Sequence, residues 1–306
     1  MSTNESSKIA LLGLAAAGKT SYLEVLQQEF RALYDIKATI GVDRNKIRIL
    51  GSDLYIYDYG GQQLYREDYL KNPSKYLSQI DLMLYFVDVQ DMENLDNSVE
   101  YYKNLFKLPE IQTIDPEKII IFIHKMDPEI KSDPRIRSRV KKIKENFNAI
   151  KKAQYYETSI NDYWSIIFSF SGAFRKIRKI AEVLNKILKE FSRATFSSGV
   201  VLVDTNFLIL DIHASNEENL KITDEGFQQF VGIWAKQAAE GNPPEKLQTE
   251  LKGGKGYFQK FKYEDEEYYI MAYSRNPRTE KLILEKLPEL ANRIFEILMG
   301  FYFDED

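Results

Sequence analysis

The stretch GLAAAGKTS, at residues 13–21, fits the pattern G-x-x-x-x-G-K-[ST], which forms a loop around nucleotide phosphates. It lies between an apolar run and a helical pattern, as such a loop requires. Successive backbone N–H groups and the positive end of the helix attract phosphate, while Lys19 can neutralise the β- and γ-oxygens and Thr20 can hold Mg²⁺. The predicted phosphate-binding residues are Ala15, Ala16, Ala17, Gly18, Lys19, Thr20 and Ser21.

A second motif, YDYGGQ at residues 57–62, follows another apolar run. At the end of that strand Asp58 can hold Mg²⁺ through water, the Gly61 N–H can reach the γ-phosphate, and Gln62 can orient an attacking water. Thr39, within ATIGVD at 38–43, is placed to close over the same ion. The predicted metal ligands are therefore Thr20, Thr39 and, through water, Asp58, and the predicted catalytic residues are Gln62, Lys19 and Gly61.

A third motif ends the apolar run IIIFIH with Lys125-Met126-Asp127. The Asp127 carboxylate can accept hydrogen bonds from N1–H and the exocyclic amine of guanine, whereas adenine offers no such pair of donors. The stem of Lys125 can lie over the base, and a ring N–H of His124 can fasten the loop. ETSI at 157–160 can offer a backbone N–H to the guanine O6. The predicted nucleotide-binding residues thus extend to His124, Lys125, Asp127, Ser159 and Ile160, and the predicted ligands are GTP or GDP with Mg²⁺.

These motifs need strands that end at one edge of a sheet. Near-continuous apolar runs predict strands at 8–14, 46–51, 54–59, 81–89, 118–124 and 153–159, with helical patterns at 19–33, 63–79, 94–107, 133–151 and from 163 onward. Alternating strands and helices predict an α/β fold with a six-stranded, mostly parallel, doubly wound sheet. Only GSD separates the second and third strands, so this pair should be an antiparallel hairpin.

A different organisation begins after residue 172. Apolar residues repeat in steps of four and three from Phe170 to Phe191, which predicts a long amphipathic helix that is either continuous or broken near Gly172. We predict two domains, at residues 1–172 and 173–306. The second should be an α+β sandwich, built from a hairpin at 199–214, a helix at 224–240, strands at 256–263 and 266–274, and a helix at 279–299. The exposed edge of such a sheet favours dimerisation over a packing module without a partner.

Composition narrows the possible partners and compartments. The 42 basic and 46 acidic residues leave a net charge of −4, so no nucleic acid partner is expected. The basic face of the helix at 133–151 is interpreted as a solvated surface rather than a site for acidic partners or anionic lipids. The absence of cysteine fits a reducing compartment, and two histidines are too few for a multi-histidine metal site. With no signal peptide, no apolar run of about 18 residues and no lipidation motif, we expect a cytoplasmic protein that reaches membranes only through partners.

The motifs together resemble those of the Rag/Gtr branch of the Ras superfamily of small GTPases. HKMD and TSI match the Rag/Gtr motifs for the base, Gly-Gly-Gln after the aspartate is shared by the Rag and Arf groups, and GLAAAGKTS and TIGV are Arf-like. Small GTPases usually carry asparagine at the position of His124, and the stretch QLYREDYL after Gln62 departs from the family pattern. The resemblance covers residues 8–172 and continues more loosely beyond them.

This resemblance implies a Ras-like GTPase domain followed by a smaller roadblock/longin-like domain. It further implies a nucleotide-dependent switch that works as a homo- or heterodimer with a related GTPase and docks on roadblock-type scaffold or regulatory proteins. Two functions stay open. One is a switch that hydrolyses GTP slowly without an activating partner. The other is a nucleotide-stabilised scaffold with negligible hydrolysis, because Ala15 and Ala16 can crowd Gln62. A small-metabolite kinase is disfavoured, since it would need a lid and an acceptor site.

Overall fold

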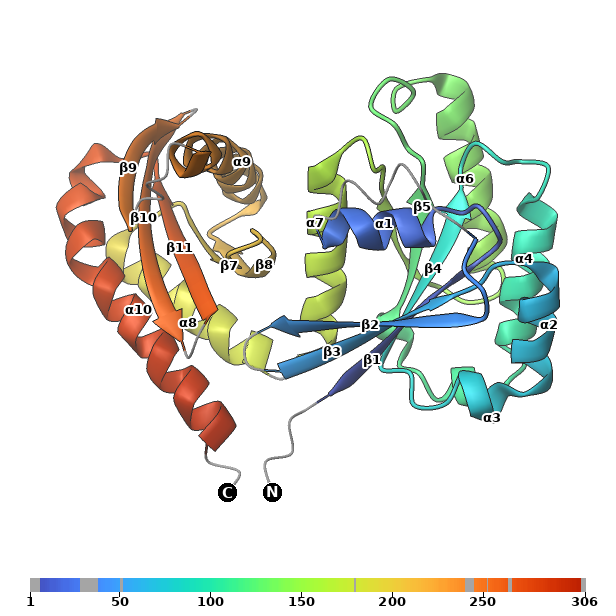
Figure 1. Cartoon of the computed structure of the whole chain (residues 1–306). Helices are drawn as coiled ribbons and strands as arrows, with labels where there is room; N and C mark the ends of the chain where they lie inside the picture. The colour runs from blue at the N-terminus through green and yellow to red at the C-terminus, as the bar shows by residue number, and fades with distance from the viewer. Residues whose placement is uncertain are drawn as a thin grey trace. The chain divides into compact units, whose positions relative to one another are not determined.

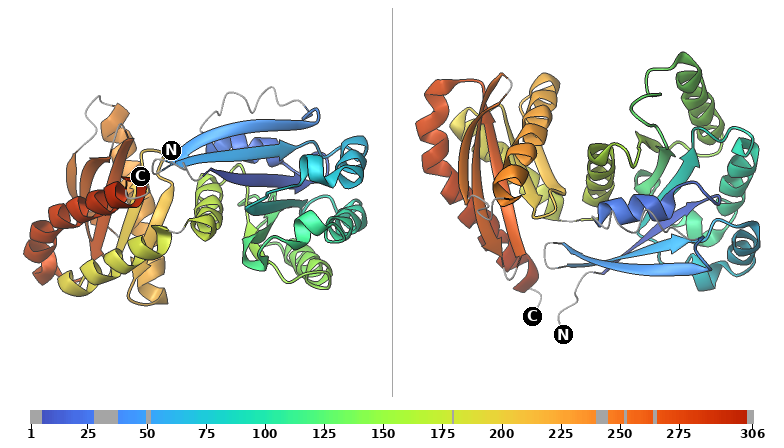
Figure 2. Two further views of the ribbon diagram at one scale, coloured as in Figure 1. Left: turned by 90° about the horizontal axis from the view of Figure 1, so that it is seen from below. Right: turned by 45° about the horizontal axis from the view of Figure 1, so that its top comes forward.

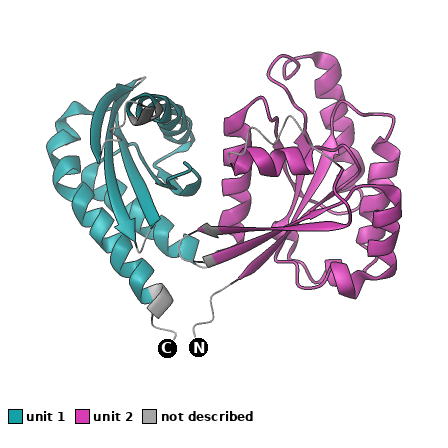
Figure 3. Cartoon of the chain, viewed as in Figure 1, with its two compact units in different colours: residues 1–3, 178–306 teal, residues 4–177 magenta. Residues whose placement is uncertain are grey.

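The computed structural model describes residues 6–27, 38–49, 52–178, 180–239, 245–251, 253–263 and 266–303. The chain divides into two compact units, an N-terminal unit of residues 4–177 and a C-terminal unit that begins at residue 178 (Figure 3). The sequence pattern placed this boundary at residue 172, inside the last helix of the N-terminal unit. Each unit has a sheet of its own and is described separately below.

The N-terminal unit contains a six-stranded sheet in the order β2-β3-β1-β4-β5-β6. Its strands are β1 (Ser7–Gly13), β2 (Val42–Ile49), β3 (Ser52–Tyr59), β4 (Leu82–Asp88), β5 (Ile119–His124) and β6 (Gln154–Glu157). Only the β2–β3 pair is antiparallel, and the other pairs are parallel. The predicted α/β fold class, with its mostly parallel sheet and one hairpin, is confirmed.

Helices cover both faces of this sheet (Figures 1 and 2). Helices α1 (Lys19–Leu26) and α7 (Tyr163–Phe174) pack together on one face, while α2 (Gln63–Lys71), α4 (Leu95–Leu105) and α6 (Pro134–Asn148) line the other. The short helices α3 (Pro73–Tyr76) and α5 (Pro109–Gln112) lie in connections. Coverage on both faces explains why β4 and β5 are almost wholly apolar and buried.

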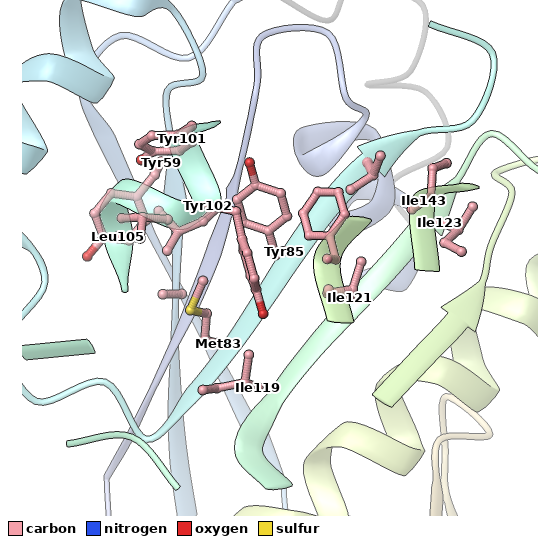
Figure 4. Packing of buried hydrophobic residues seen from close by; sticks show 14 of the residues in the cluster. Tyr59, Met83, Tyr85, Tyr101, Tyr102, Leu105, Ile119, Ile121, Ile123 and Ile143 are labelled. Atoms are coloured by element: carbon pink, nitrogen blue, oxygen red, sulfur yellow. The ribbon is translucent and has the colours of Figure 1, made fainter. Parts of the chain in front are cut away.

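An aromatic core fixes β4 and β5 against α4 and α6 (Figure 4). The ring of Tyr85 lies 5.0 Å from that of Tyr102 and 5.6 Å from that of Phe147. Its hydroxyl donates to the backbone oxygen of Ser98 at 2.8 Å, so the buried polar atom is satisfied. Because this core is close-packed, the carboxyl ends of β4 and β5 are held rigidly where the site begins.

Two predicted helices are divided in the structure. The pattern at 63–79 forms α2 and α3, which are separated at Asn72 because Pro73 has no N–H to continue the first helix. The long helix expected from Phe170 to Phe191 is broken rather than continuous, since α7 ends at Phe174 and a 3₁₀ turn follows at Arg175–Ile177 before α8 (Ile180–Thr195) begins. Of the helix expected at 19–33, residues 28–33 lie outside the described residues.

Gly172 is not the point of this break. It lies inside α7, where a Cβ atom would stand 2.1 Å from the hydroxyl oxygen of Tyr156 on β6. The glycine therefore allows α7 to approach the sheet closely.

The basic face of α6 is partly neutralised, with Arg135 paired to Asp133 at 2.8 Å and Arg137 to Glu157 at 2.7 Å.

The C-terminal unit is an α+β sandwich, as expected. Its five-stranded antiparallel sheet has the order β8-β7-β11-β10-β9. The strands are β7 (Gly199–Asp204), β8 (Ile209–Ala214), β9 (Lys246–Leu251), β10 (Gly254–Tyr263) and β11 (Glu266–Ser274). Helices α8 and α10 (Glu280–Phe303) cover one face, and α9 (Glu217–Ala239) covers the other (Figure 1). Strand β9 was not predicted, because KLQTEL is largely polar. Among the described residues, no helix has the length and apolar character needed to cross a bilayer.

Candidate nucleotide-binding site

A cleft of about 390 Å³ opens at the carboxyl edge of the parallel sheet in the N-terminal unit. It is formed by the loop after β1, the start of α1, the segment before β2, the turn after β3 and the loop after β5. Its lining residues are Ala15, Ala16, Gly18, Lys19, Thr20, Ser21, Ala38, Thr39, Gly61, Gln62 and Lys125. The structure thus gathers residues from all three sequence motifs in one place.

The loop at 14–18 turns sharply so that α1 begins with its N-terminus at the cleft. Ala16 has φ +58° and Gly18 has φ +88°, both in the left-handed region, and Ala17 is buried with its N–H directed to Leu14 O at 3.4 Å. Lys19 is buried, and its Nζ donates to Leu14 O at 2.9 Å. Burial lowers the pKa of Lys19 to about 8, although the charge of Asp58 opposes the shift. The loop therefore presents N–H groups and a cation to the cleft.

Three predicted metal ligands converge at one point. The Thr20 hydroxyl donates to Asp58 Oδ2 at 2.5 Å, the Thr39 hydroxyl donates to the same oxygen at 3.0 Å, and the two hydroxyls are 3.0 Å apart. Burial raises the pKa of Asp58, against the opposing charge of Lys19. Its other oxygen, Oδ1, is buried and has no hydrogen-bond partner among the described residues.

This donor set fits Mg²⁺. The ion prefers oxygen ligands and is usually bound by one or two protein groups together with waters and substrate phosphates. No group of three or more acidic, histidine or cysteine side chains that could form an all-protein metal site occurs in the described parts of the chain. The cluster therefore suits an ion that a nucleotide helps to hold.

The turn after β3 lies against the phosphate loop. A Cβ atom on Gly61 would stand 2.3 Å from the backbone nitrogen of Ala15, so only glycine allows this approach. Gln62 is exposed at the edge of the cleft and precedes α2 as its N-cap. The predicted catalytic residues Lys19, Gly61 and Gln62 therefore line the same cleft.

The Asp127 carboxylate is held by three neighbours. Oδ1 accepts hydrogen bonds from the Ser159 hydroxyl and, at 3.3 Å, from Asn161 Nδ2, and Oδ2 accepts from Gln90 Nε2 at 3.1 Å. Lys125 pairs with Asp88 through Nζ and Oδ2 at 2.7 Å. Both polar side chains of the motif are thus oriented by other residues of the same unit.

His124 lies beneath the phosphate loop and is almost fully buried. Its Nδ1 lies 2.8 Å from the Thr158 hydroxyl, and a Cβ atom on Gly18 would stand 2.3 Å from its Cδ2. Burial lowers the pKa of His124 to about 4, and the charge of Lys125 adds to the shift. The ring is therefore neutral near pH 7 and connects the phosphate loop, its own loop and the segment at 157–160.

Ser159 makes contacts that differ from the expected one. Its backbone N–H donates to the Ser165 hydroxyl at 2.9 Å, while its own hydroxyl binds Asp127. Ser159 therefore orients the carboxylate, and the exposed Ile160 is the better candidate to offer a backbone N–H to the base.

Four residues in this network were missed by the sequence reasoning. They are Asp88, Gln90, Thr158 and Asn161. Asp88 lies near the end of the predicted strand at 81–89 and Gln90 follows that strand, so the rule that polar residues at strand ends face the site would have found them. Thr158 and Asn161 flank Ser159 and Ile160 in the sequence, and only their contacts distinguish them.

Comparisons with known proteins find a G protein family and individual relatives with similar sequences. A family model described as the Gtr1/RagA G protein conserved region matches residues 8–231. The GTP-binding protein GTR1 of Saccharomyces cerevisiae is 29% identical over 133 residues, which cover 42% of this chain and 42% of that protein. ADP-ribosylation factor-like protein 3 of the same yeast is 32% identical over 151 residues, or 48% of this chain and 70% of that protein. The match thus spans less than half the length of GTR1.

A solved structure was also matched. It is the Arl6 BBS3 small GTPase from Trypanosoma brucei with a bound nucleotide analogue, GppNp, with 16% sequence identity and a TM-score of 0.44. The match covers 56% of this chain and 97% of that one.

Proposed function

The chain belongs to the Gtr1/RagA family of G proteins, and on that premise we propose that it is a switch that binds GTP and GDP with Mg²⁺ and slowly hydrolyses GTP. Family membership agrees with the resemblance seen in HKMD and TSI. The observation that carries the proposal is the meeting of three elements at one sheet edge. These are the phosphate loop with Lys19, the oxygen cluster around Asp58, and the oriented carboxylate of Asp127.

Each residue has a role that its position supports. The N–H groups of the phosphate loop and the Lys19 ammonium bind phosphate oxygens, and contact with these anions stabilises the protonated lysine. Thr20 and Thr39 would hold Mg²⁺ directly, and Asp58 would hold it through water. When bound, the ion neutralises charge on the phosphate oxygens. Gln62, exposed at the edge of the cleft, can orient the attacking water.

Base selection rests on Asp127. Three hydrogen bonds from Ser159, Asn161 and Gln90 fix both carboxylate oxygens. A carboxylate held in this way accepts from the two neighbouring donors of guanine, and adenine would leave it unpaired.

The groups that line the cleft support the proposal of slow hydrolysis. Ras-like domains alone turn over at about 10⁻⁴–10⁻³ s⁻¹ and gain up to roughly 10⁵-fold when a partner supplies an arginine. No arginine lines the cleft in the described part of the chain. The scaffold alternative is favoured by Ala15 and Ala16, whose side chains line the cleft that Gln62 also lines. A Gln62→Leu variant separates the two, because equal hydrolysis by variant and parent would make Gln62 idle.

We further propose that the C-terminal unit supports a homo- or heterodimer with a related GTPase and docking on roadblock-type scaffold or regulatory proteins. Strands β8 and β9 are the edges of its sheet and provide surfaces for pairing. A cytoplasmic location, with membrane recruitment only through partners, completes the proposal. Sedimentation velocity of the full chain, with GDP and with a non-hydrolysable GTP analogue, tests the dimer.

Nucleotide titration tests the central proposal. The parent chain with Mg²⁺ should bind GTP and GDP at least about 100-fold more tightly than ATP, and Asp127→Asn should lose most of that preference while gaining affinity for xanthosine triphosphate. Asp133→Asn is the matched control, since the Asp133 side chain caps α6 and pairs with Arg135. Preference of the parent for ATP, or binding of neither nucleotide, would refute the proposal. Release of phosphate in single-turnover assays then tests hydrolysis itself.

A further inference from the structure

Helix α2 contacts both loops that close the cleft. Arg66 Nε donates to Gly61 O at 3.0 Å, next to Gln62, and the Tyr69 hydroxyl donates to Gly41 O at 2.6 Å, two residues after Thr39. Residues three apart on a helix share a face, so the two side chains reach the two loops from one side of α2.

The two loops are also hydrogen-bonded to each other, and their backbones are closely packed. The Gly60 N–H donates to Gly41 O at 2.8 Å, and a Cβ atom on Gly60 would stand 2.6 Å from Thr39 O. Gly61 in turn lies against the backbone of Ala15 in the phosphate loop. Because these contacts are close-packed, a shift of one loop must displace the other.

Both side chains of α2 are themselves anchored. The Tyr69 ring is buried, with ring centroids 5.2 Å from Tyr59 and 5.1 Å from Tyr76. The Arg66 guanidinium carbon lies 5.1 Å from the centroid of the Tyr101 ring on α4. The guanidinium is thus committed to the Gly61 carbonyl and an aromatic face.

We propose that Arg66 and Tyr69 are positioning residues that fasten the loops carrying Thr39 and Gln62 to one helix, so that both loops adopt the hydrolytic arrangement together. The proposal rests on the proposed function. Neither side chain lines the cleft, so their effect should fall on the rate of hydrolysis more than on nucleotide affinity.

Two conservative variants test this role. Tyr69→Phe removes only the hydroxyl, and Arg66→Lys keeps the charge but loses the Nε donor and the planar face. Each should lower single-turnover GTP hydrolysis about tenfold while GDP affinity changes less than about threefold. Tyr155→Phe and Arg137→Lys are the controls, because the Tyr155 hydroxyl donates to Asn148 and Arg137 pairs with Glu157, away from both loops. Hydrolysis within twofold of the parent, or an equal loss of affinity, would overturn the proposal.

Amide hydrogen exchange provides a readout that does not require hydrolysis. In Tyr69→Phe the Gly60 N–H, which bonds to Gly41 O, should exchange about five- to tenfold faster, as expected when one supporting hydrogen bond is lost, while amides of α6 stay unchanged. Unchanged exchange at Gly60 would overturn the fastening role. If the parent releases no phosphate, the proposed function and the hydrolytic part of this role fail, and faster exchange would still support the mechanical part.

Discussion

At the scale of single residues, the contact between Gly18 and His124 joins the phosphate loop to the loop proposed to bind the base. A methyl group at Gly18 would meet the imidazole at 2.3 Å, and the backbone there has φ +88°. Gly18→Ala should therefore lower nucleotide affinity at least about tenfold and reduce the free energy of unfolding by about 1–3 kcal/mol. Titration and chemical denaturation measure the two effects.

Gly232 supplies the control for this substitution. It lies in α9, is exposed, and a Cβ atom there would meet nothing within 4 Å. Gly232→Ala should raise the free energy of unfolding by about 0.5–1 kcal/mol, because alanine is the better helix former. If Gly18→Ala binds nucleotide as the parent does, the imidazole does not confine the loop.

The buried His124 should also make stability depend on pH. Its pKa is about 4 in the folded chain and near 6.5 when unfolded, so between these values the unfolded state binds one more proton. The stabilisation is complete above pH 6.5 and is lost as pH falls from 6.5 to 4, by about 1.4 kcal/mol per pH unit at most. Denaturation of the parent and His124→Asn at pH 7, 6 and 5 measures this.

The difference in free energy of unfolding between the parent and His124→Asn isolates the contribution of the histidine. The pKa of His213 is also lowered, and burial raises the pKa of Asp204 and Asp224 to about 7, but these groups are common to both chains. The variant should lose less stability than the parent on acidification. Parallel curves for the two proteins would show that the ring is protonated at little cost.

The meeting of the residues proposed to bind phosphate and base was predictable from sequence because each motif fixes a short stretch of backbone at a strand end. Lys19, Thr39 and Gln62 were expected together and line one cleft. The partners of these residues were not predictable. Gln90 and Asn161 reach Asp127 across 37 and 34 positions of sequence, and such contacts depend on how the loops pack.

At the scale of elements, the approach of α7 to β6 depends on Gly172. A Cβ atom there would stand 2.1 Å from the Tyr156 hydroxyl and 2.9 Å from the ring carbon that bears it. Gly172→Ala should therefore lower the free energy of unfolding by about 1–3 kcal/mol. Adding Tyr156→Phe, which removes only the hydroxyl, should recover part of this loss. A double variant no more stable than Gly172→Ala would place the strain elsewhere.

The sequence predicted some helices and strands better than others, because the patterns that mark them differ in strength. Apolar runs located the buried strands well, since burial on both faces requires nearly continuous apolar residues. The break between α7 and α8 could not be placed correctly from sequence because apolar steps of three and four continue across it, and a 3₁₀ turn preserves one face for a few residues. Strand β9 was missed for the opposite reason, as its exposed residues alternate with partly buried ones at a sheet edge.

At the scale of the whole molecule, the two units have separate sheets and separate cores. The sequence indicated this division because the alternation of strands and helices gives way to an α+β pattern after residue 172. The sequence could not place the boundary between residues 177 and 178, because the helical pattern runs through both α7 and the turn that follows it.

Separate cores predict two unfolding transitions, of which a guanine nucleotide should affect one. A ligand that binds only the folded state at 100 times its Kd adds about 2.7 kcal/mol, which should raise the Tm of the N-terminal unit by roughly 5–10 °C. Differential scanning calorimetry of the full chain with GDP and Mg²⁺ measures this shift. The other transition should not move, ATP should have little effect, and EDTA should reduce the shift by removing the Mg²⁺ that we propose binds near Asp58. If one transition carries all the heat and moves as a whole, the units unfold cooperatively and the division seen in the cores does not extend to stability.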